Sequence, residues 1–437
     1  MNEIEAPITD LSHDGRGVAR IDGKTVFVSG ALLGEQVRMR IRKRHRNFDE
    51  AETIEVITPS PHRVEPRCSH FGQCGGCSLQ HLDAFAQIEA KQRVLVDNFA
   101  RIGKVEPESW LPPLTGEPWG YRRKGRLSVR AVAKKGRVLV GFREESNPRF
   151  VADIVHCDVV HPALGPKIGL LGELVGGMDA AAEIAQIEFA AGDDTLALVF
   201  RHLKPLSDGD RAKLVAFGQQ HDFAIYLQPG GVSSVHPLWP EHPRLAFRVP
   251  AGDGVDDVEL EFQPLDFVQI NAGMNRRMLA RTFELLDPQS QDRVLDLFCG
   301  LGNFTLPLAR RVAEVTGVEG EHGLVARAAE NAARNGIANA HFQVANLFED
   351  QRNTDWARKP WDKLLLDPPR AGADKVLDYL PHKETHRIVY VSCHPASLAR
   401  DAGILVNQHG FRLVSAGVMD MFPHTAHVES IALFERR

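Results

Sequence analysis

The sequence predicts a multidomain α/β protein with an N-terminal OB-like β-barrel, a central α+β region and a C-terminal Rossmann-like sheet. Short β-branched runs separated by glycine turns fill residues 1–58, which is typical of a small barrel. From residue 292 onward, apolar strand-like runs alternate with helical runs, which predicts a doubly wound parallel sheet. A chain of 437 residues is long enough for two or three domains. We expect them at residues 1–60, 61–265 and 266–437.

The composition is that of a folded enzyme. Apolar residues make up 43% of the chain and charged residues 25%. With 52 Lys and Arg against 57 Asp and Glu, the net charge is −5, which excludes a uniformly basic surface. No stretch approaches the ~18 apolar residues of a membrane span, and the N-terminus lacks a signal-peptide pattern. We expect a cytoplasmic monomer that does not contact a membrane.

The barrel and the linker after it are marked by turns and prolines. We expect strands over Thr25–Ser29, Gln36–Ile41 and Glu52–Ile57, because these alternating runs lie between glycine-containing turns. Three prolines, at positions 59, 61 and 66, then indicate a linker.

The central region has a mixed pattern. Apolar residues at helical spacing predict a helix over residues 83–102. Strands are expected at Arg137–Phe142 and Thr195–Phe200, and an alanine-rich helix at Asp179–Ile184. These elements predict an α+β arrangement.

The C-terminal region is predicted to hold seven strands. The last two are separated by little helical sequence, so we expect an antiparallel pair at the sheet edge. The predicted strands are Val294–Phe298, Glu314–Val318, Ala340–Val344, Leu364–Leu366, Ile388–Ser392, Arg412–Met419 and Glu429–Phe434.

Polar residues follow four of these strands. The first strand ends in D-L-F-C-G-L-G-N-F, where Gly300 and Gly302 allow close approach of a ligand. Glu319 lies 23 residues after Asp296, an offset suited to ribose hydroxyls. Asn346 and Asp367 end the next two units, the latter in D-P-P-R. Ligands bind at the carboxyl ends of such strands. The set resembles the class I S-adenosylmethionine-dependent methyltransferases.

A cysteine and a carboxylate point to pyrimidine chemistry. Cys393 ends a buried strand, and a thiolate that adds to carbon 6 of uracil makes carbon 5 nucleophilic. A base must afterwards remove the proton from carbon 5. Glu429, at the start of the last strand, and His427 are both candidates for this base.

Five motifs then resemble the RNA (uracil-C5)-methyltransferase family: F-V-Q-I-N at 267–271, D-L-F-C-G-x-G-N-F, D-P-P-R, S-C-x-P, and F-P-x-T-x-H-V-E. The resemblance implies that Cys393 is the nucleophile and Glu429 the base. It also implies S-adenosylmethionine contacts by Gln269, Phe298, Asn303, Glu319, Asn346 and Asp367. His394 stands where the family usually has Asn. Cys299 is expected to be a core residue.

Four further cysteines suggest a metal site. Cys68, Cys74 and Cys77 form C-x5-C-x2-C, and Cys157 lies 80 residues after Cys77. Four thiolates suit either zinc or an iron–sulfur cluster, and the five-residue gap argues against radical S-adenosylmethionine chemistry. The pattern resembles family members that act on 23S rRNA and implies a [4Fe–4S] cluster with these four ligands.

Two basic blocks suggest an RNA partner. Arg38–Arg46 carries six Lys or Arg residues and Tyr121–Arg143 carries nine, with no acid in either. Residues 1–58 also resemble the TRAM domain, an RNA-binding barrel. A buried uridine must leave its stack before a thiolate can reach it, so a single-stranded loop of 23S rRNA is the expected substrate. The alternatives are another rRNA or tRNA uridine, which the domain content disfavours, and a non-catalytic RNA-binding or assembly factor.

Overall fold

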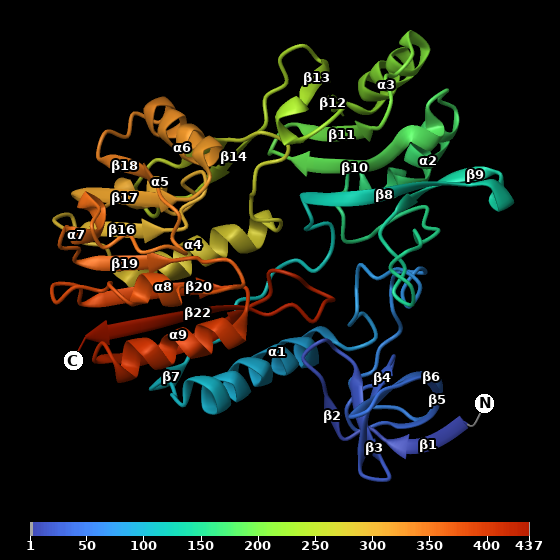
Figure 1. The fold of residues 1–437 in the computed structure, drawn as a ribbon, viewed down its shortest axis with the longest axis horizontal. Coiled ribbons are helices and arrows are strands. Elements are labelled where there is room, and N and C mark those ends of the chain that lie inside the picture. The colour runs from blue at the N-terminus through green and yellow to red at the C-terminus, as the bar shows by residue number, and fades with distance from the viewer. Residues whose placement is uncertain (1–2, 437) are drawn as a thin grey trace. The chain divides into compact units, whose positions relative to one another are not determined.

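The computed structural model describes residues 3–436 and divides into two compact units (Figure 1). The first unit comprises residues 1–94 together with the short segments 142–152 and 422–427. The second comprises residues 95–141, 153–421 and 428–437. No helix among residues 3–436 is long and apolar enough to cross a membrane.

The first unit contains a six-stranded sheet in the order β1-β5-β6-β4-β3-β2. Alternate residues of its strands point inward, and they include the fully buried Val28, Val37 and Met39. All three strands expected here are present, and the OB-like barrel prediction agrees with this sheet. The strands are β1 Glu3–Pro7, β2 Asp10–Leu11, β3 Gly17–Ile21, β4 Lys24–Ser29, β5 Gln36–Arg44 and β6 Phe48–Thr58.

The predicted helix over residues 83–102 is confirmed. It consists of α1 Ala84–Asn98 followed by one π-helical turn, Phe99–Gly103. Lys104 ends the turn in the left-handed conformation, and its N–H bonds to the carbonyl of Phe99.

The central part of the second unit is a six-stranded sheet in the order β13-β12-β11-β10-β8-β9. Both predicted strands of this region are present. The elements are β8 Lys124–Val132, β9 Arg137–Gly141, α2 Ile168–Gly176, β10 Ile184–Ala191, β11 Leu196–His202, α3 Asp208–His221, β12 Phe223–Gln228 and β13 His236–Trp239.

The expected alanine-rich helix at Asp179–Ile184 is wrong. Only a 3₁₀ turn forms, at Ala181–Glu183, and the chain then enters β10. The carboxylate of Asp210 accepts the N–H groups of Asp179 and Ala180 at 2.8 and 3.0 Å. These tertiary hydrogen bonds fasten the segment to α3 and override its helix propensity.

The C-terminal part holds an eight-stranded sheet in the order β18-β17-β16-β19-β20-β22-β21-β7. The neighbours from β18 to β20 are parallel, and helices lie along the faces of the sheet (Figure 1). The strands are β7 Ser109–Trp110, β16 Arg293–Leu297, β17 Glu314–Glu319, β18 Ala340–Val344, β19 Lys363–Leu366, β20 Arg387–Ser392, β21 Phe411–Met419 and β22 Glu429–Arg436. The helices are α4 Ala272–Leu286, α5 Thr305–Ala309, α6 His322–Arg334, α7 Asp355–Arg358, α8 Asp374–Leu377 and α9 Pro395–Asn407.

The predicted antiparallel pair is present as β21 and β22. The last strand does not lie at the edge, however. β22 pairs with both β20 and β21, and β7 adds a further parallel strand outside β21. β22 is therefore an interior strand, which places its first residue beside the end of β20.

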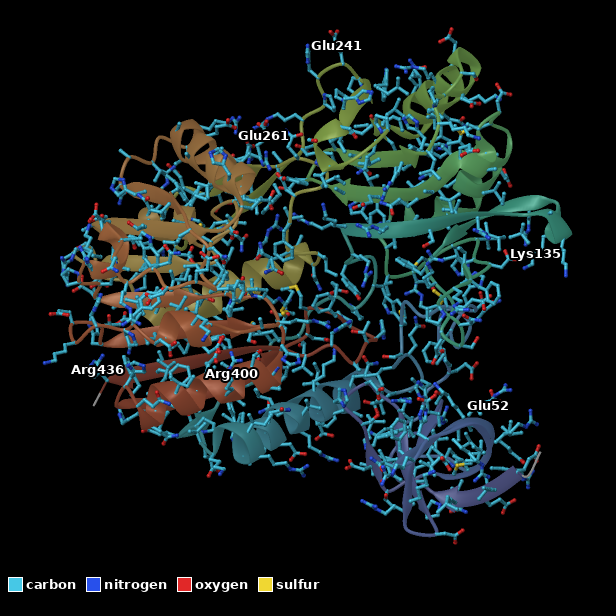
Figure 2. All side chains as sticks on the ribbon, in the orientation of Figure 1. Glu52, Lys135, Glu241, Glu261, Arg400 and Arg436 are labelled. Carbon is cyan, nitrogen blue, oxygen red and sulfur yellow. The ribbon has the colours of Figure 1, made fainter. Side chains whose placement is uncertain are left out.

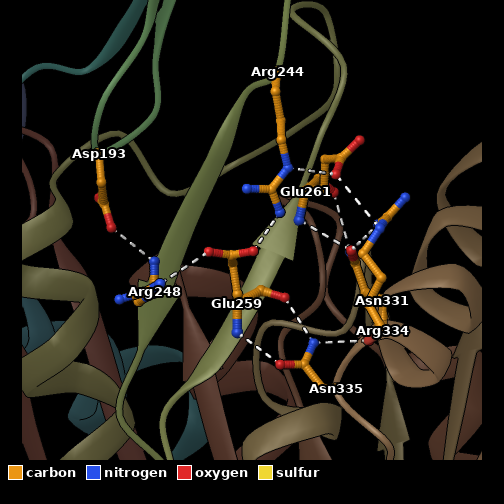
Figure 3. Close-up of polar contacts among 8 residues, drawn as sticks. All are labelled: Asp193, Arg244, Arg248, Glu259, Glu261, Asn331, Arg334 and Asn335. Atoms are coloured by element: carbon orange, nitrogen blue, oxygen red, sulfur yellow. Dashed lines mark hydrogen bonds and ion pairs between the residues drawn. The ribbon is translucent and has the colours of Figure 1, made fainter.

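A hairpin of β14 Ala246–Val249 and β15 Val258–Glu261 leads from the central sheet to the C-terminal sheet. The amides of Asn331 and Asn335, one turn apart on α6, bond to the backbone of β15 as a neighbouring strand would (Figure 3). Each amide donates to one carbonyl and accepts one N–H, at 2.8–3.0 Å. The edge of β15 is thereby satisfied by side chains of a helix.

Candidate active site

The carboxyl ends of the parallel strands bring the predicted cofactor residues to one edge of the sheet. β16 pairs with β17 on one side and β19 on the other. Asp296, Glu319 and Asp367 therefore end or follow three adjacent strands. The pKa of Asp296 is perturbed electrostatically by the other two carboxylates. The structure thus brings together these three predicted positions.

The turn after β16 is tightly constrained. Phe298, Gly300 and Gly302 all have positive φ values, of 65°, 57° and 92°. Such values are costly for residues other than glycine, so Phe298 is held there by its surroundings, with its N–H bonded to Val318. The N–H of Gly300 donates to Glu319 at 3.2 Å. The glycine loop and the second strand are thereby fixed to each other.

Burial disfavours the ionised form of the carboxyl groups at this edge of the sheet. Asp296 is fully buried, and burial raises its pKa to about 7, with the hydroxyl of Thr305 donating to it at 2.5 Å. Burial also raises the pKa of Asp367 to about 7. Carboxyls in this state favour a ligand with positive charge, which would lower their pKa values again. The charge of a sulfonium fits this requirement.

The other predicted cofactor residues differ in their burial and in their hydrogen-bond partners. Asn303 forms a reciprocal amide pair with the buried Asn275 of α4, at 2.9 and 3.0 Å. Gln269 is half-buried on the segment after β15, which is fastened to α6 by the ion pair between Arg327 and Asp266. Asn346 is exposed and bonds within its own loop. Sequence reasoning missed Asn275, because nothing in its helical segment distinguishes it from a surface amide.

Strand register places Cys393 beside Glu429. β20 and β22 run antiparallel and pair Ser392 with Ser430, whose hydroxyl donates to the Ser392 carbonyl at 3.2 Å. Cys393 directly follows the last residue of β20, and Glu429 is the first residue of β22, so both lie at the same end of this strand pair. The charge of Glu429 acts on the pKa of Cys393, so the predicted nucleophile and base lie near each other although they are 36 residues apart in the sequence.

Burial and neighbouring negative charge both disfavour ionisation of Cys393 and Glu429. Burial, followed by the charges of Glu429 and Asp367, raises the pKa of Cys393 to about 11, while Arg370 acts in the opposite direction. Burial and the charge of Asp367 raise the pKa of Glu429 well above its usual range. At pH 8 a thiol with a pKa of about 11 is ~0.1% ionised. A positively charged ligand would therefore increase the fraction of Cys393 that is present as thiolate.

Two histidines close to these residues in the sequence differ in their surroundings. His394, which departs from the family pattern, is the N-cap of α9, and its Nδ1 accepts the N–H of Ser397. Asn is a preferred capping residue, so the substitution keeps a structural function. His427 is exposed and its ring lies 5.3 Å from that of Phe422. Cys299 is buried, as expected for a core residue.

Three of the four remaining cysteines lie in one loop of the first unit. The carbonyl of Cys68 accepts the N–H of Phe71 at 3.1 Å, and the N–H of Cys74 donates to His70 at 2.9 Å. These turns fold part of the segment Cys68–Cys77 back on itself. Thiols are ligands that iron and zinc prefer. Cys157 belongs to the second unit, and its N–H donates to Gly165 at 3.0 Å. None of the six cysteines is in a disulfide.

The first basic block is largely neutralised by its fold. Alternate arginines of β5 face acids of β1 and β6, and Glu52 of β6 is labelled in Figure 2. Arg38 pairs with Glu5 and Glu55, and Arg40 pairs with Glu3 at 3.1 Å and Glu52 at 3.7 Å. The sequence showed no acid in this run, because its partners come from other strands.

The second block is also partly structural. Arg123 is 6% exposed and lies over the ring of Phe247. Lys135, labelled in Figure 2, and Arg137 both pair with Asp153. No described residue forms an ion pair with four cations of the two blocks: Lys43, Arg46, Arg130 and Lys134.

Comparison with known proteins yields two family models. The model described as tRNA (Uracil-5-)-methyltransferase matches residues 255–437, and the TRAM domain matches residues 2–54. A protein of Xanthomonas oryzae pv. oryzae named 23S rRNA (uracil(1939)-C(5))-methyltransferase RlmD is 63% identical over 99% of this chain and 97% of its own length. A protein of the same name from Stenotrophomonas maltophilia is 62% identical, with the same coverage.

One solved structure is similar along the whole chain. The Pyrococcus abyssi tRNA (uracil-54, C5)-methyltransferase, in complex with S-adenosyl-L-homocysteine, covers 99% of this chain and 100% of its own. Its TM-score is 0.76 and its sequence identity 25%.

Proposed function

The chain belongs to the RNA (uracil-C5)-methyltransferase family, and from this premise we propose that it converts a uridine of 23S rRNA to 5-methyluridine. It is an S-adenosylmethionine-dependent enzyme with an N-terminal TRAM domain and a C-terminal methyltransferase domain. The position of Cys393 and Glu429 at the same end of β20 and β22 carries the mechanistic part of the proposal.

The chemistry begins when the thiol of Cys393 loses its proton to solvent. The resulting thiolate adds to carbon 6 of the uracil, and the electron pair of the ring double bond moves toward the carbonyl at carbon 4. Carbon 5 becomes a nucleophile and forms a bond to the methyl group, whose bond to the sulfonium sulfur of S-adenosylmethionine would break. Splitting one difficult step into two easier ones is the benefit of covalent catalysis.

The second half regenerates the enzyme. Glu429 removes the proton from carbon 5, the double bond between carbons 5 and 6 forms again, and the bond to the Cys393 sulfur breaks. Burial raises the pKa of Glu429, which makes its carboxylate a stronger base toward the proton on carbon 5. Glu429 is favoured over His427 because it is buried and its charge acts on Cys393, whereas His427 is exposed.

S-adenosylmethionine, when bound, supplies the methyl group from a positively charged sulfur. Glu319 would hold the ribose, and the Phe298–Gly302 turn would approach the cofactor closely. Gln269, Asn303, Asn346 and Asp367 complete the proposed contacts. The buried carboxyls Asp296 and Asp367 supply the negative field that a sulfonium requires.

We also propose that Cys68, Cys74, Cys77 and Cys157 hold a [4Fe–4S] cluster. The support is the spacing of the four cysteines, three of which lie in one folded loop. The purified protein should be brown, with broad absorption near ~400 nm, and Cys74→Ser should lose this absorption together with its iron. A colourless protein that contains zinc would contradict the proposal.

The proposed RNA partner is a single-stranded loop, since base flipping costs least there. Lys43, Arg46, Arg130 and Lys134 are the proposed phosphate contacts. We propose that the enzyme acts as a cytoplasmic monomer, because one copy of the chain supplies the whole site.

Mapping of 5-methyluridine in rRNA and tRNA, from cells with and without this protein, tests the function directly. Loss of a single 23S rRNA methyl group is expected. Loss from tRNA would reassign the substrate, and an unchanged pattern would favour an assembly factor.

A further inference from the structure

One carboxylate that the mechanism does not use is fully buried beneath the active site. Asp401 lies on α9, the helix that begins just after Cys393, and has no solvent exposure. Its Oδ2 accepts the hydroxyl of Tyr390 at 2.6 Å and the N–H of Ala373 at 2.7 Å, and its Oδ1 accepts Nε of Arg400 at 2.8 Å. A buried charge with this many donors holds its neighbours firmly in place.

These partners close around the turn that follows the D-P-P-R motif. Arg400, labelled on α9 in Figure 2, donates from Nη2 to the carbonyl of Ala371 at 2.9 Å. Gly372 has a φ of 83°, and a Cβ atom there would lie 2.4 Å from Nη2 of Arg400 and 2.7 Å from Oδ2 of Asp401. The turn is therefore in direct contact with the network, with no room for a side chain.

The same turn carries Arg370, the positive group that favours the thiolate of Cys393. Arg370 lies within the turn closed by the N–H of Gly372 on the carbonyl of Pro369 at 2.8 Å. The charges that act on the pKa of Cys393 are those of Glu429, Asp367 and Arg370. Asp367 is held by its own N–H bond to Leu297 of β16, at 3.3 Å. Arg370 lies beyond this anchor and next to the turn that Asp401 holds. Loosening that turn would thus displace Arg370 first.

We propose that Asp401, Arg400 and Tyr390 form a positioning network that keeps Arg370 beside Cys393. Asp401 contacts neither substrate nor cofactor in this view, and acts through the turn at residues 371–373. The inference rests on the proposed function only in taking Cys393 as the reacting thiol. It assigns a role in the reaction to a buried carboxylate that lies outside the motifs of the sequence.

The test measures the rate at which iodoacetamide alkylates Cys393 as a function of pH, by mass spectrometry of the peptide that contains it. Asp401→Asn and Gly372→Ala should shift the midpoint of this profile upward by about one unit, a roughly tenfold lower rate at pH 8. Tyr390→Phe removes one donor and should give a smaller shift. Asp374→Asn is the matched control, because it removes only the exposed ion pair between Asp374 and Arg400.

A double-mutant cycle separates positioning from general loosening of the fold. Arg370→Gln alone should raise the midpoint, and adding Asp401→Asn to it should produce no further shift. If the Asp401 and Gly372 variants are folded and keep the wild-type profile, or if their shift persists without Arg370, the proposal is overturned. Should Asp401→Asn fail to fold, Gly372→Ala and Tyr390→Phe decide the matter.

The alkylation assay uses no RNA, so its outcome is separate from that of the proposed function. A wild-type protein that methylates no uridine would refute the proposed function, while the comparison of alkylation profiles would still report on the network. Conversely, active enzyme with unshifted variant profiles would refute only the network.

Discussion

Replacing the proposed base with its amide should trap the covalent intermediate. Glu429→Gln keeps the size and packing of the side chain at the start of β22, where it is 4% exposed. Because burial already disfavours the charged carboxylate, a neutral amide should not destabilise the fold. The variant should still add Cys393 to the uracil and transfer the methyl group. It cannot remove the proton from carbon 5.

The loss of rate expected for Glu429→Gln follows from the burial of Glu429. General bases contribute about 10²–10⁴-fold to rate, which corresponds to roughly 3–5 kcal/mol in the barrier. Water has little access to replace a carboxylate at a site this enclosed, so we expect a value in the upper part of this range. A turnover of about one per second would then become minutes to hours, long enough for the adduct to accumulate.

The assay is a denaturing gel of the variant mixed with S-adenosylmethionine and a 23S rRNA fragment. A protein–RNA band that survives denaturation is expected for Glu429→Gln, and it should be absent from the Cys393→Ala/Glu429→Gln double variant. Clean turnover by Glu429→Gln, together with adduct formation by His427→Ala, would refute the assignment and make His427 the base.

Three further predictions concern the nucleophile, a buried acid and an ion pair. Cys393→Ala should abolish methyl transfer while RNA binding persists in a gel-shift assay; residual turnover would refute covalent catalysis. Asp296 has a raised pKa of about 7 in the folded state, so its contribution to unfolding free energy falls as pH rises from about 4 to 7. The urea stability of Asp296→Asn relative to wild type should therefore rise by on the order of 4 kcal/mol over that interval; a constant difference would contradict this. Lys363→Met should lower the free energy of unfolding by about 3–5 kcal/mol, because it leaves the buried Asp292 carboxylate, 2.8 Å from Lys363, without its cation. An unchanged melting temperature would contradict this prediction.

Local patterns predicted the C-terminal sheet well because parallel strands are buried on both faces. The runs Leu364–Leu366 and Ile388–Ser392 are largely apolar and lie between helical segments, and the structure places buried strands there. The alanine-rich segment at Asp179–Ile184 failed because its conformation depends on Asp210, which lies some thirty residues away. Helix propensity is a weak prior that such contacts override.

Charge was the property that sequence described least accurately. Arg38 and Arg40 read as free phosphate ligands, since no acid lies near them along the chain. In the folded barrel, acids of β1 and β6 lie across from them. Cross-strand pairing brings together residues that are distant in sequence, so a basic run reveals only one side of its electrostatic environment.

The sequence by itself determined the family, the chemistry and the candidate nucleophile and base, because each is carried by residue types within short motifs. Only the tertiary structure decided that Cys393 and Glu429 are neighbours, since this depends on β22 inserting between β20 and β21. The tertiary structure also decided the direction in which the pKa values of Cys393 and Glu429 shift, because these shifts depend on burial and on Asp367. Motifs identify reactive groups, whereas strand order and exclusion of water fix their distances and pKa values.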